Sequence, residues 1–343
     1  MEATADIDPN VIPTASFTLD DDDVALPYVA AEGARCAVWF RGVERFRGAV
    51  YRLRGTGPSG RVTAFVRGDL RKFWEWQGWP VPSASLAAQT DEYRTLSGGS
   101  EEVFKTAISE NFVRLGVPWS AAPGRGLGRP TRAQLRFHPL ADKLFPALTA
   151  DNLIVTLQYP PAGGVVVDVR ESRLLPGVLT NMSGIPGDFS YERSAPTATR
   201  VIVGGRGEGV EREFVEVREP QREVDWGDIT EAFRDARNTE IGSDLSVEGR
   251  ERLAETATTS GVSSDLVETS TFQFGTTYDV GDRVNVRVGP IDREQQIGVG
   301  ITESIEEGVV VKPRIGDIED STSAILAKQI ARLARTQRDT GRR

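Results

Sequence analysis

The sequence contains a single cysteine and a single histidine, and this scarcity excludes several kinds of site. Cys36 has no second cysteine with which to form an intramolecular disulfide. Its alternating surroundings favour the role of a small buried hydrophobic side chain over that of a reactive thiol. One cysteine and one histidine cannot build a Cys/His zinc site, and a Ser-His-Asp triad would depend on His138 without any Gly-x-Ser-x-Gly motif to support it. We therefore expect no metal and no cofactor.

Long apolar runs are missing as well. No stretch approaches the roughly 18–20 apolar residues that a membrane helix requires. The first residues, Met1-Glu-Ala-Thr-Ala-Asp6, are acidic, whereas a secretory signal begins with basic residues and continues into an apolar segment. The sequence therefore predicts a soluble globular protein without membrane insertion.

An excess of basic charge is also absent. The formal net charge is −9, and arginine greatly outnumbers lysine. Proteins that hold DNA through its phosphates normally carry a basic excess, so high-affinity nucleic-acid binding is disfavoured. Passage of DNA is still compatible with this composition, because an acidic surface repels phosphate and lets a duplex slide.

The chain has 343 residues, of which 39 % are hydrophobic and 27 % are charged, and a chain of this length normally divides into two or more domains. Apolar residues recur at period two in the segments 16–67, 153–169, 200–218 and 265–316, as expected for strands. Helical spacing is found in the segments 100–115, 140–148, 226–238 and 247–258.

Strand-rich and helical portions that alternate in this way predict a β-rich α+β chain rather than a parallel βαβ series. We divide it into a first β-barrel region at 1–70, a helical α+β insert at 71–150, a β-hairpin region that contributes to the barrels at 151–225, a helical segment at 226–263, a second β-barrel region at 264–318 and a basic C-terminal tail at 319–343.

The clearest strand pattern lies near the C-terminus. Val284, Val286 and Val288 alternate with polar residues, and the segment 296–302 places Ile and Val between glycine and threonine. A glycine turn then leads into the apolar segment 308–316, which indicates antiparallel hairpins.

Two patterns that suggest catalysis or phosphate binding have simpler explanations. Gly204-Gly-Arg-Gly-Glu-Gly209 lacks both the Walker and the Rossmann spacing and precedes a strand, so a wide turn between strands is favoured. A glycosidase needs two facing carboxylates, and sequence proximity does not establish that geometry. The adjacent acidic pairs, each also explained as a helix start, a strand edge or a turn, are Glu101/Glu102, Glu211/Glu213 and Glu306/Glu307.

Trp74, Trp76 and Trp79 form the densest aromatic cluster. Closely spaced tryptophans can stack on sugar rings, which makes them candidate sugar-stacking residues. Packing into the core of the helical insert is favoured over this role, because aromatic side chains are more often buried than displayed.

The sequence resembles the baseplate-hub or tail-associated proteins, usually labelled minor tail proteins, of long-tailed phages that infect actinobacteria. The segments that carry the resemblance are 11–17, Trp74-Glu-Trp-Gln-Gly-Trp-Pro80, Ser109-Glu-Asn-Phe-Val-Arg-Leu-Gly116, 204–209, 226–238 and Tyr278-Asp-Val-Gly-Asp-Arg-Val284.

The resemblance implies a structural, non-enzymatic protein of the virion that lies at the phage tail tip and is assembled in the host cytoplasm. It implies two tube-type antiparallel β-barrels with further helical or α+β domains. Three copies would form a ring that joins the six-fold tail tube or distal tail protein to the trimeric tip, contacts tip and fibre proteins, and surrounds the channel through which DNA leaves without specific binding. The alternatives are a carbohydrate-binding receptor-recognition module and a tail-associated cell-wall hydrolase.

The tail at 319–343 is the most basic part of the chain. Arg332, Arg335 and Arg338 lie beside a narrow apolar seam and are candidate contacts to an acidic neighbouring tip protein. A frayed, solvated terminus explains the same pattern, because so short a seam gives only a marginal isolated helix.

Overall fold

The computed structural model describes residues 2–315 apart from 59, 181, 184–185, 194, 238–243, 257–259, 290 and 307. The basic tail with Arg332, Arg335 and Arg338 lies outside the described residues. The chain forms two compact units, and their described parts comprise residues 2–188, 264–288 and 292–315 for the first, and 189–263, 289 and 291 for the second.

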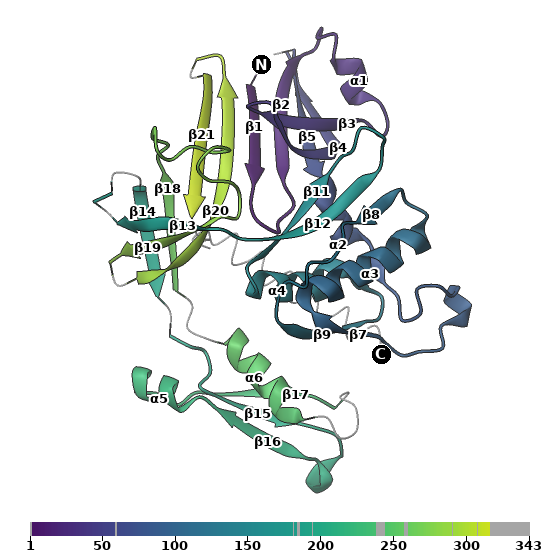
Figure 1. The fold of residues 1–343 in the computed structure, drawn as a ribbon, viewed down its shortest axis with the longest axis vertical. Coiled ribbons are helices and arrows are strands. Elements are labelled where there is room, and N and C mark those ends of the chain that lie inside the picture. Colours follow the sequence, from purple (N-terminus) through teal and green to yellow (C-terminus); the bar gives the residue numbers. More distant parts are fainter. Residues whose placement is uncertain are drawn as a thin grey trace. The chain divides into compact units, whose positions relative to one another are not determined.

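An eleven-stranded sheet is the largest element of the structure (Figure 1). Neighbouring strands in this sheet follow the order β14 (Pro186–Arg193), β18 (Ser260–Leu266), β21 (Gly308–Ile315), β20 (Ile291–Ser304), β1 (Glu2–Ile7), β2 (Thr14–Asp20), β5 (Arg61–Gly68), β4 (Val43–Thr56) and β3 (Arg35–Phe40). Two further strands extend the sheet: β19 (Arg283–Val288) pairs with β20 and also with the parallel strand β13 (Leu174–Thr180). The short helix α1 (Leu26–Ala30) connects β2 to β3.

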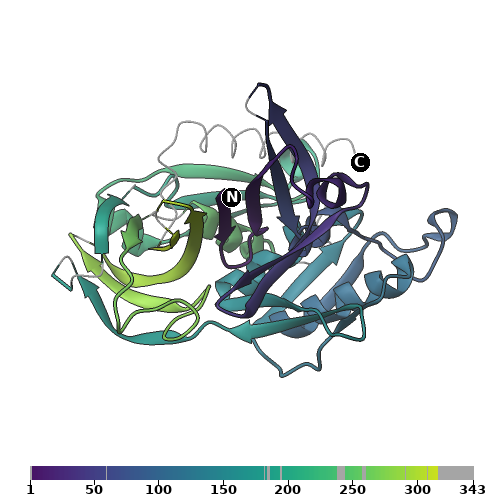
Figure 2. The same ribbon diagram turned by 90° about the horizontal axis from the view of Figure 1, so that it is seen from above.

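The expected strand alternation near the C-terminus is confirmed. Val284, Val286 and Val288 are all buried, and β20 and β21 form the predicted antiparallel hairpin, with Ile297 and Val299 fully buried. The antiparallel pairing of β1 with β20 joins the N-terminal strands to this hairpin, as Figures 1 and 2 show. The regions expected to form two separate barrels are therefore hydrogen-bonded into one sheet, and its path ends at β14 and β3.

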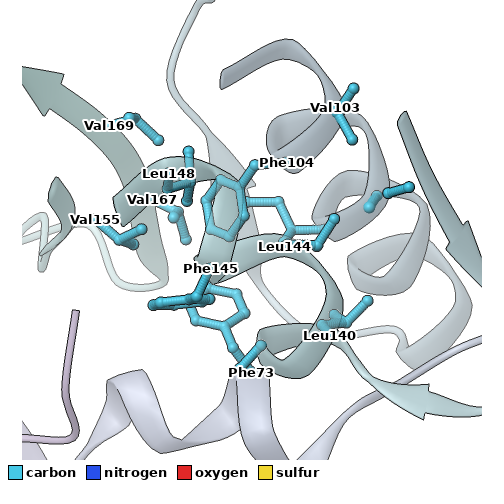
Figure 3. Close-up of a cluster of buried hydrophobic side chains, with 14 of the residues drawn as sticks. Phe73, Val103, Phe104, Leu140, Leu144, Phe145, Leu148, Val155, Val167 and Val169 are labelled. Carbon is cyan, nitrogen blue, oxygen red and sulfur yellow. The ribbon is translucent and has the colours of Figure 1, made fainter. Parts of the chain in front are cut away.

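The α+β insert predicted at 71–150 packs as a layer of helices with small sheets around one hydrophobic core, and it also includes the hairpin at 153–171 that was expected to contribute to the barrels. Its helices are η1 (Asp69–Arg71), α2 (Lys72–Glu75), η2 (Leu86–Ala88), α3 (Ser100–Leu115) and α4 (Leu140–Ala150). In one small sheet β12 (Val165–Glu171) lies between β11 (Leu153–Gln158) and β8 (Trp119–Ala121). Two further sheets pair β7 (Arg94–Gly99) with β9 (Pro130–Leu135), and β6 (Gln77–Gly78) with β10 (His138–Pro139). Figure 3 shows Phe73, Phe104 and Phe145 meeting at the centre of this core.

Helix α3 forms where the sequence predicts it, with small differences at both ends. Ser100 was expected to cap it, but the helix begins at Ser100 itself, and the Ser100 hydroxyl donates to Asp151 at 2.6 Å. At the other end Gly116 adopts φ +61°, and the Gly116 and Val117 amides donate to the carbonyls of Val113 and Phe112, which is a Schellman cap. Leu115, expected on the buried stripe, is exposed because the stripe ends at Phe112.

The second unit contains a three-stranded sheet with a helix against one face (Figure 1). Strand β15 (Arg200–Gly204) lies between antiparallel β16 (Phe214–Arg218) and parallel β17 (Glu231–Asp235), and the short η3 (Gly209–Glu211) lies in the turn that joins β15 to β16. Helix α6 (Leu245–Glu255) packs on Val201 and Val203. The predicted glycine-rich turn between strands is confirmed.

The prediction of a helix at 226–238 is wrong. Helix α5 (Pro220–Trp226) ends at Gly227, which adopts φ +63°, and the next regular element is strand β17. The spacing of Ile229, Phe233 and Ala236 imitates a helical stripe, but Ile229 and Phe233 are exposed. The segment 226–263 is consequently mixed in structure rather than helical.

Candidate functional site

One face of the large sheet carries a series of hydroxyl groups. Thr4 on β1 pairs with Ser16 on β2, and their hydroxyl oxygens are 2.8 Å apart. Thr18 pairs with Thr63 on β5, and these hydroxyls are 3.1 Å apart. Directly paired residues point to the same side of a sheet, so the hydroxyls share one face. We call this the polar face, and its members are Thr4, Asp6, Ser16, Thr18, Arg52, Arg54, Thr63, Gly298, Gly300, Thr302, Lys312 and Arg314, with the apolar Phe65 and Val310 among them in register with Ser16 and Thr302.

The opposite face of the same strands is apolar. Ala5, Leu19, Ala64 and Val299 alternate with residues of the polar face and are buried. The two sides of the sheet therefore have different roles: one packs into the protein, and the other presents mainly polar side chains.

Charges on the polar face are paired where β1 meets β20 and β21. Arg314 donates to Asp6 at 2.9 Å and to Asp8 at 2.7 Å. Partial burial alone would lower the pKa of the Arg314 guanidinium, but the hydrogen bonds to Asp8 and Asp6 raise it above its ordinary value. Gly298 and Gly300 leave room for these side chains, and a hollow of about 240 Å³ lies beside Thr302.

The β4 end of the face is more basic. Arg52 lies across from Phe65, with its guanidinium 5.7 Å from the ring centroid, and Arg54 lies across from Thr63. The face thus combines neutral hydroxyls, the neutralised Arg314 and three exposed cations, Arg52, Arg54 and Lys312. This surface differs from the acidic lining considered from the net charge, and it suits weak contact with a polyanion better than strong retention.

The three tryptophans of the predicted cluster lie in different surroundings. Trp74 packs on Phe145, with ring centroids 4.8 Å apart, and Trp79 lies under the guanidinium of Arg114 at 4.4 Å. Trp76 contacts Trp119, which is not part of the predicted cluster, and their ring centroids are 4.9 Å apart. The three are therefore not brought together as one platform, and their role as sugar-stacking residues stays a prediction.

Glu101, one member of the predicted acidic pairs, is fully buried and hydrogen-bonded. It accepts from Lys105 at 2.7 Å and from the amides of Arg125 and Leu127. Burial opposes ionisation, but these bonds lower the pKa of Glu101 below its ordinary value. Through the amides of Arg125 and Leu127, Glu101 anchors the loop before β9, so this carboxylate has a structural role.

The remaining candidates from the sequence have simple positions. His138 Nδ1 accepts the amide of Arg136 at 3.2 Å, and Cys36 is half-buried, with burial raising the pKa of its thiol. Among the described residues, no group of three or more His, Cys, Asp or Glu side chains is placed to hold a metal ion. Within the same part of the chain, none of the helices combines the length and apolar character needed to cross a membrane.

This arrangement of a large sheet, an α+β insert and a smaller unit is shared with solved tail proteins of phages and prophages. The 43 kDa tail protein of prophage MuSo2 from Shewanella oneidensis aligns with a TM-score of 0.58 at 12% identity, covering 92% of this chain and 93% of that one. Prophage tail protein gp18 from Listeria monocytogenes EGD-e gives 0.52 at 14% identity, with 97% and 93% covered. A tail protein from Neisseria meningitidis MC58 gives 0.51 at 14% identity, with 92% and 91% covered. The chain therefore has a phage tail protein fold.

The family described as Siphovirus ReqiPepy6 Gp37-like protein matches residues 34–317, and this chain belongs to that family. No curated protein matches the sequence. The resemblance to tail proteins of long-tailed phages is thus confirmed at the level of family and fold, whereas an actinobacterial host stays a prediction.

Proposed function

We propose that this protein is a structural component of the phage virion and forms the baseplate hub at the tail tip. Family membership and the tail-protein fold support this role. The observation that carries the proposal is the pairing of β1 with β20, which joins two strand-rich regions from opposite ends of the chain into one sheet with a continuous polar face.

Three copies of the chain close into a ring. One group of strands, β13, β14 and β18 to β21, and a second group, β1 to β5, act as two similar tube-type barrel units per copy. A trimer then offers six such units to the six-fold tail tube or distal tail protein, while its own three-fold symmetry matches the trimeric tip. This geometry explains why the two groups are fused side by side.

The polar face lines the channel through which DNA leaves. Hydroxyls and the neutralised Arg314 give DNA a wettable wall around β1 and β20. Strong phosphate binding would hold the genome during ejection, so the neutral hydroxyl groups of this wall suit passage. The protein acts by assembly in the host cytoplasm and not as an enzyme, and it does not insert into membranes.

The basic C-terminal tail contacts an acidic neighbouring tip or fibre protein. Arg332, Arg335 and Arg338 supply the charge for this contact. Deletion of residues 320–343 should reduce the number of tips that acquire their neighbour while leaving the fold of the remainder intact. Tip assembly that proceeds unchanged after this deletion would contradict the contact.

The hub itself is tested by native mass and negative-stain images of the purified chain, alone and after addition of tail-tube or distal-tail protein. We expect a three-fold ring with a central hole in at least one of the two states. A chain that stays monomeric with the partner present, and forms no annular assembly, would refute the hub.

A further inference from the structure

A pocket of about 360 Å³ lies between the β3–β4 strands and the α+β insert of the first unit. Its lining includes Arg35, Asp69, Lys72, Trp76, Trp119 and Tyr159. The volume is at the lower end of the range for small-molecule sites, about 300–1,000 Å³. Neither the hub role nor the polar face uses this pocket.

The aromatic walls of the pocket are held in place by the fold. The Trp76 amide donates to the carbonyl of Lys72 at 2.8 Å, and its own carbonyl accepts from Leu140 at 3.0 Å. Trp119 lies on β8 in register with Val165 of β12, and the two indoles meet nearly edge to face at 72°. The half-buried rings therefore offer an apolar surface whose side-chain entropy has already been lost on folding.

The charged groups of the pocket balance one another. Arg35 pairs with Asp69, Lys72 with Glu75 at 3.0 Å, and Arg47 with Glu44 at 3.0 Å. Each cation lies beside a carboxylate, which Lys72 shares with Arg71, so a phosphate or carboxylate ligand would compete with an acid already present. The same pairs offer both donors and acceptors, which is the combination that hydroxyl groups use.

Asp69 adds a more specific signal. Its side chain is only 1% exposed, and one oxygen binds Arg35, whereas Oδ1 has no hydrogen-bond partner in the described part of the chain. A buried acceptor without a donor is unfavourable, and a hydroxyl donor bound in the pocket beside Asp69 would remove this cost.

We propose that this pocket binds a neutral saccharide, with one pyranose ring against Trp76 and Trp119 and its hydroxyls toward Asp69 and Lys72. Aromatic walls match the apolar face of a pyranose, and balanced ion pairs match its uncharged hydroxyls. A nucleotide would also stack on the indoles, but its phosphate finds no unpaired cation among the described residues that line the pocket. The chain would thus carry a sugar site in addition to its structural role.

Ligand-observed NMR on the purified full chain tests this site, with glucose, galactose, mannose and N-acetylglucosamine as neutral probes and thymidine monophosphate as the charged probe. At least one sugar should bind saturably. Lys72→Gln and Trp119→Phe should weaken that binding about ten-fold or more, because each removes a direct contact. The matched controls, Lys143→Gln on the surface of α4 and Trp39→Phe on β3, should leave it unchanged.

Circular dichroism on each variant separates lost binding from lost folding, and the polar variant Lys72→Gln keeps the test decisive even where Trp119→Phe unfolds. Absence of saturable binding by all four sugars would overturn the site, as would equal losses in the control variants. Tighter binding of thymidine monophosphate than of every sugar would reassign the pocket to nucleotides. Ring assembly of Lys72→Gln, measured in parallel, reports on the hub independently.

Discussion

Among the described residues, Glu101 and Lys105 form the most buried ion pair. Lys105 donates to Glu101, to Asp168 at 2.9 Å and to the carbonyl of Pro123 at 3.0 Å. Glu101 in turn accepts two amides of the following loop, so one helical turn of α3 fixes both β12 and a segment without regular structure. A charged pair here is tolerated because its donors and acceptors are satisfied.

Replacing Lys105 by methionine should therefore be severely destabilising. The variant keeps the apolar stem but leaves Glu101 buried without its cation, and removal of one partner of a buried pair costs about 3–5 kcal/mol. Urea denaturation measures the free energy of unfolding. Lys143→Met, at an exposed position of α4, serves as the control and should change stability by less than about 0.5 kcal/mol. Equal effects of the two substitutions would contradict the structural role of Lys105.

The same network predicts a pH dependence. Despite burial, the hydrogen bonds from Lys105 and nearby amides hold the pKa of Glu101 and that of Asp168 below their ordinary values. A carboxylate whose pKa is lower in the folded than in the unfolded protein contributes its full stabilisation of the fold at pH values above the unfolded-state pKa. This contribution is lost as the pH falls through the folded-state pKa.

The stability difference between wild type and Lys105→Met should accordingly be largest at neutral pH and shrink below about pH 4. Urea midpoints of both proteins, taken between neutral pH and about pH 3, provide the measurement. A difference that stays constant over this window would show that the lost packing of Lys105, and not its charge, causes the effect.

At the scale of elements, the seam between β1 and β20 depends on glycine. A Cβ at Gly298 would lie 1.9 Å from the Asp8 carboxylate, whereas a Cβ at Gly300 would meet its neighbours at ordinary contact distances. Gly298→Ala must displace Asp8 from Arg314, and we expect a loss of about 1–2 kcal/mol from the disrupted charged hydrogen bond. Gly300→Ala should be near neutral. Thermal unfolding measures the melting temperatures of both variants, and Gly298→Ala should have the lower one. Equal melting temperatures would refute this explanation of the seam.

Local patterns predicted individual elements better than their partners. Alternation located β19, β20 and β21 because the buried residues of each strand lie on one face, although Val309 at the start of β21 is exposed. It failed at 226–238, where apolar spacing suggested a helix, since Phe233 faces away from α6 and Gly227 ends α5. Periodicity reports which residues are apolar, and it does not report whether another element covers them.

The candidate site was harder to predict for the same reason. Thr4, Ser16 and Thr302 are ordinary strand residues in the sequence, and only long-range pairing places them on one face. Trp76 was selected because other tryptophans lie near it in the chain, but its partner in the pocket is Trp119. That contact follows from the parallel pairing of β8 with β12, which no local pattern contains.

At the scale of the whole molecule, the pairing of residues near position 5 with residues near position 301 makes the sheet depend on both ends of the chain. Contacts so distant in sequence form late in folding, because closing the long loop between them costs conformational entropy before the contacts stabilise the fold. In the proposed hub this dependence is useful, since only a chain folded to its last strands presents the complete polar face to a ring.

The position of the polar face within the ring can be tested in assembled phage. Thr4→Lys with Thr302→Lys places two new cations on the face, and each cation near DNA raises the salt dependence of binding by about 0.9 in log–log slope. We expect particles that assemble normally but eject DNA more slowly, with a lower infectious titre per particle. The control carries the same added charge at Val24 and Tyr28, which are exposed beside and within α1. Equal infectivity of the two double variants would place the channel wall on another surface, because only lysines that face the passing duplex can retain it.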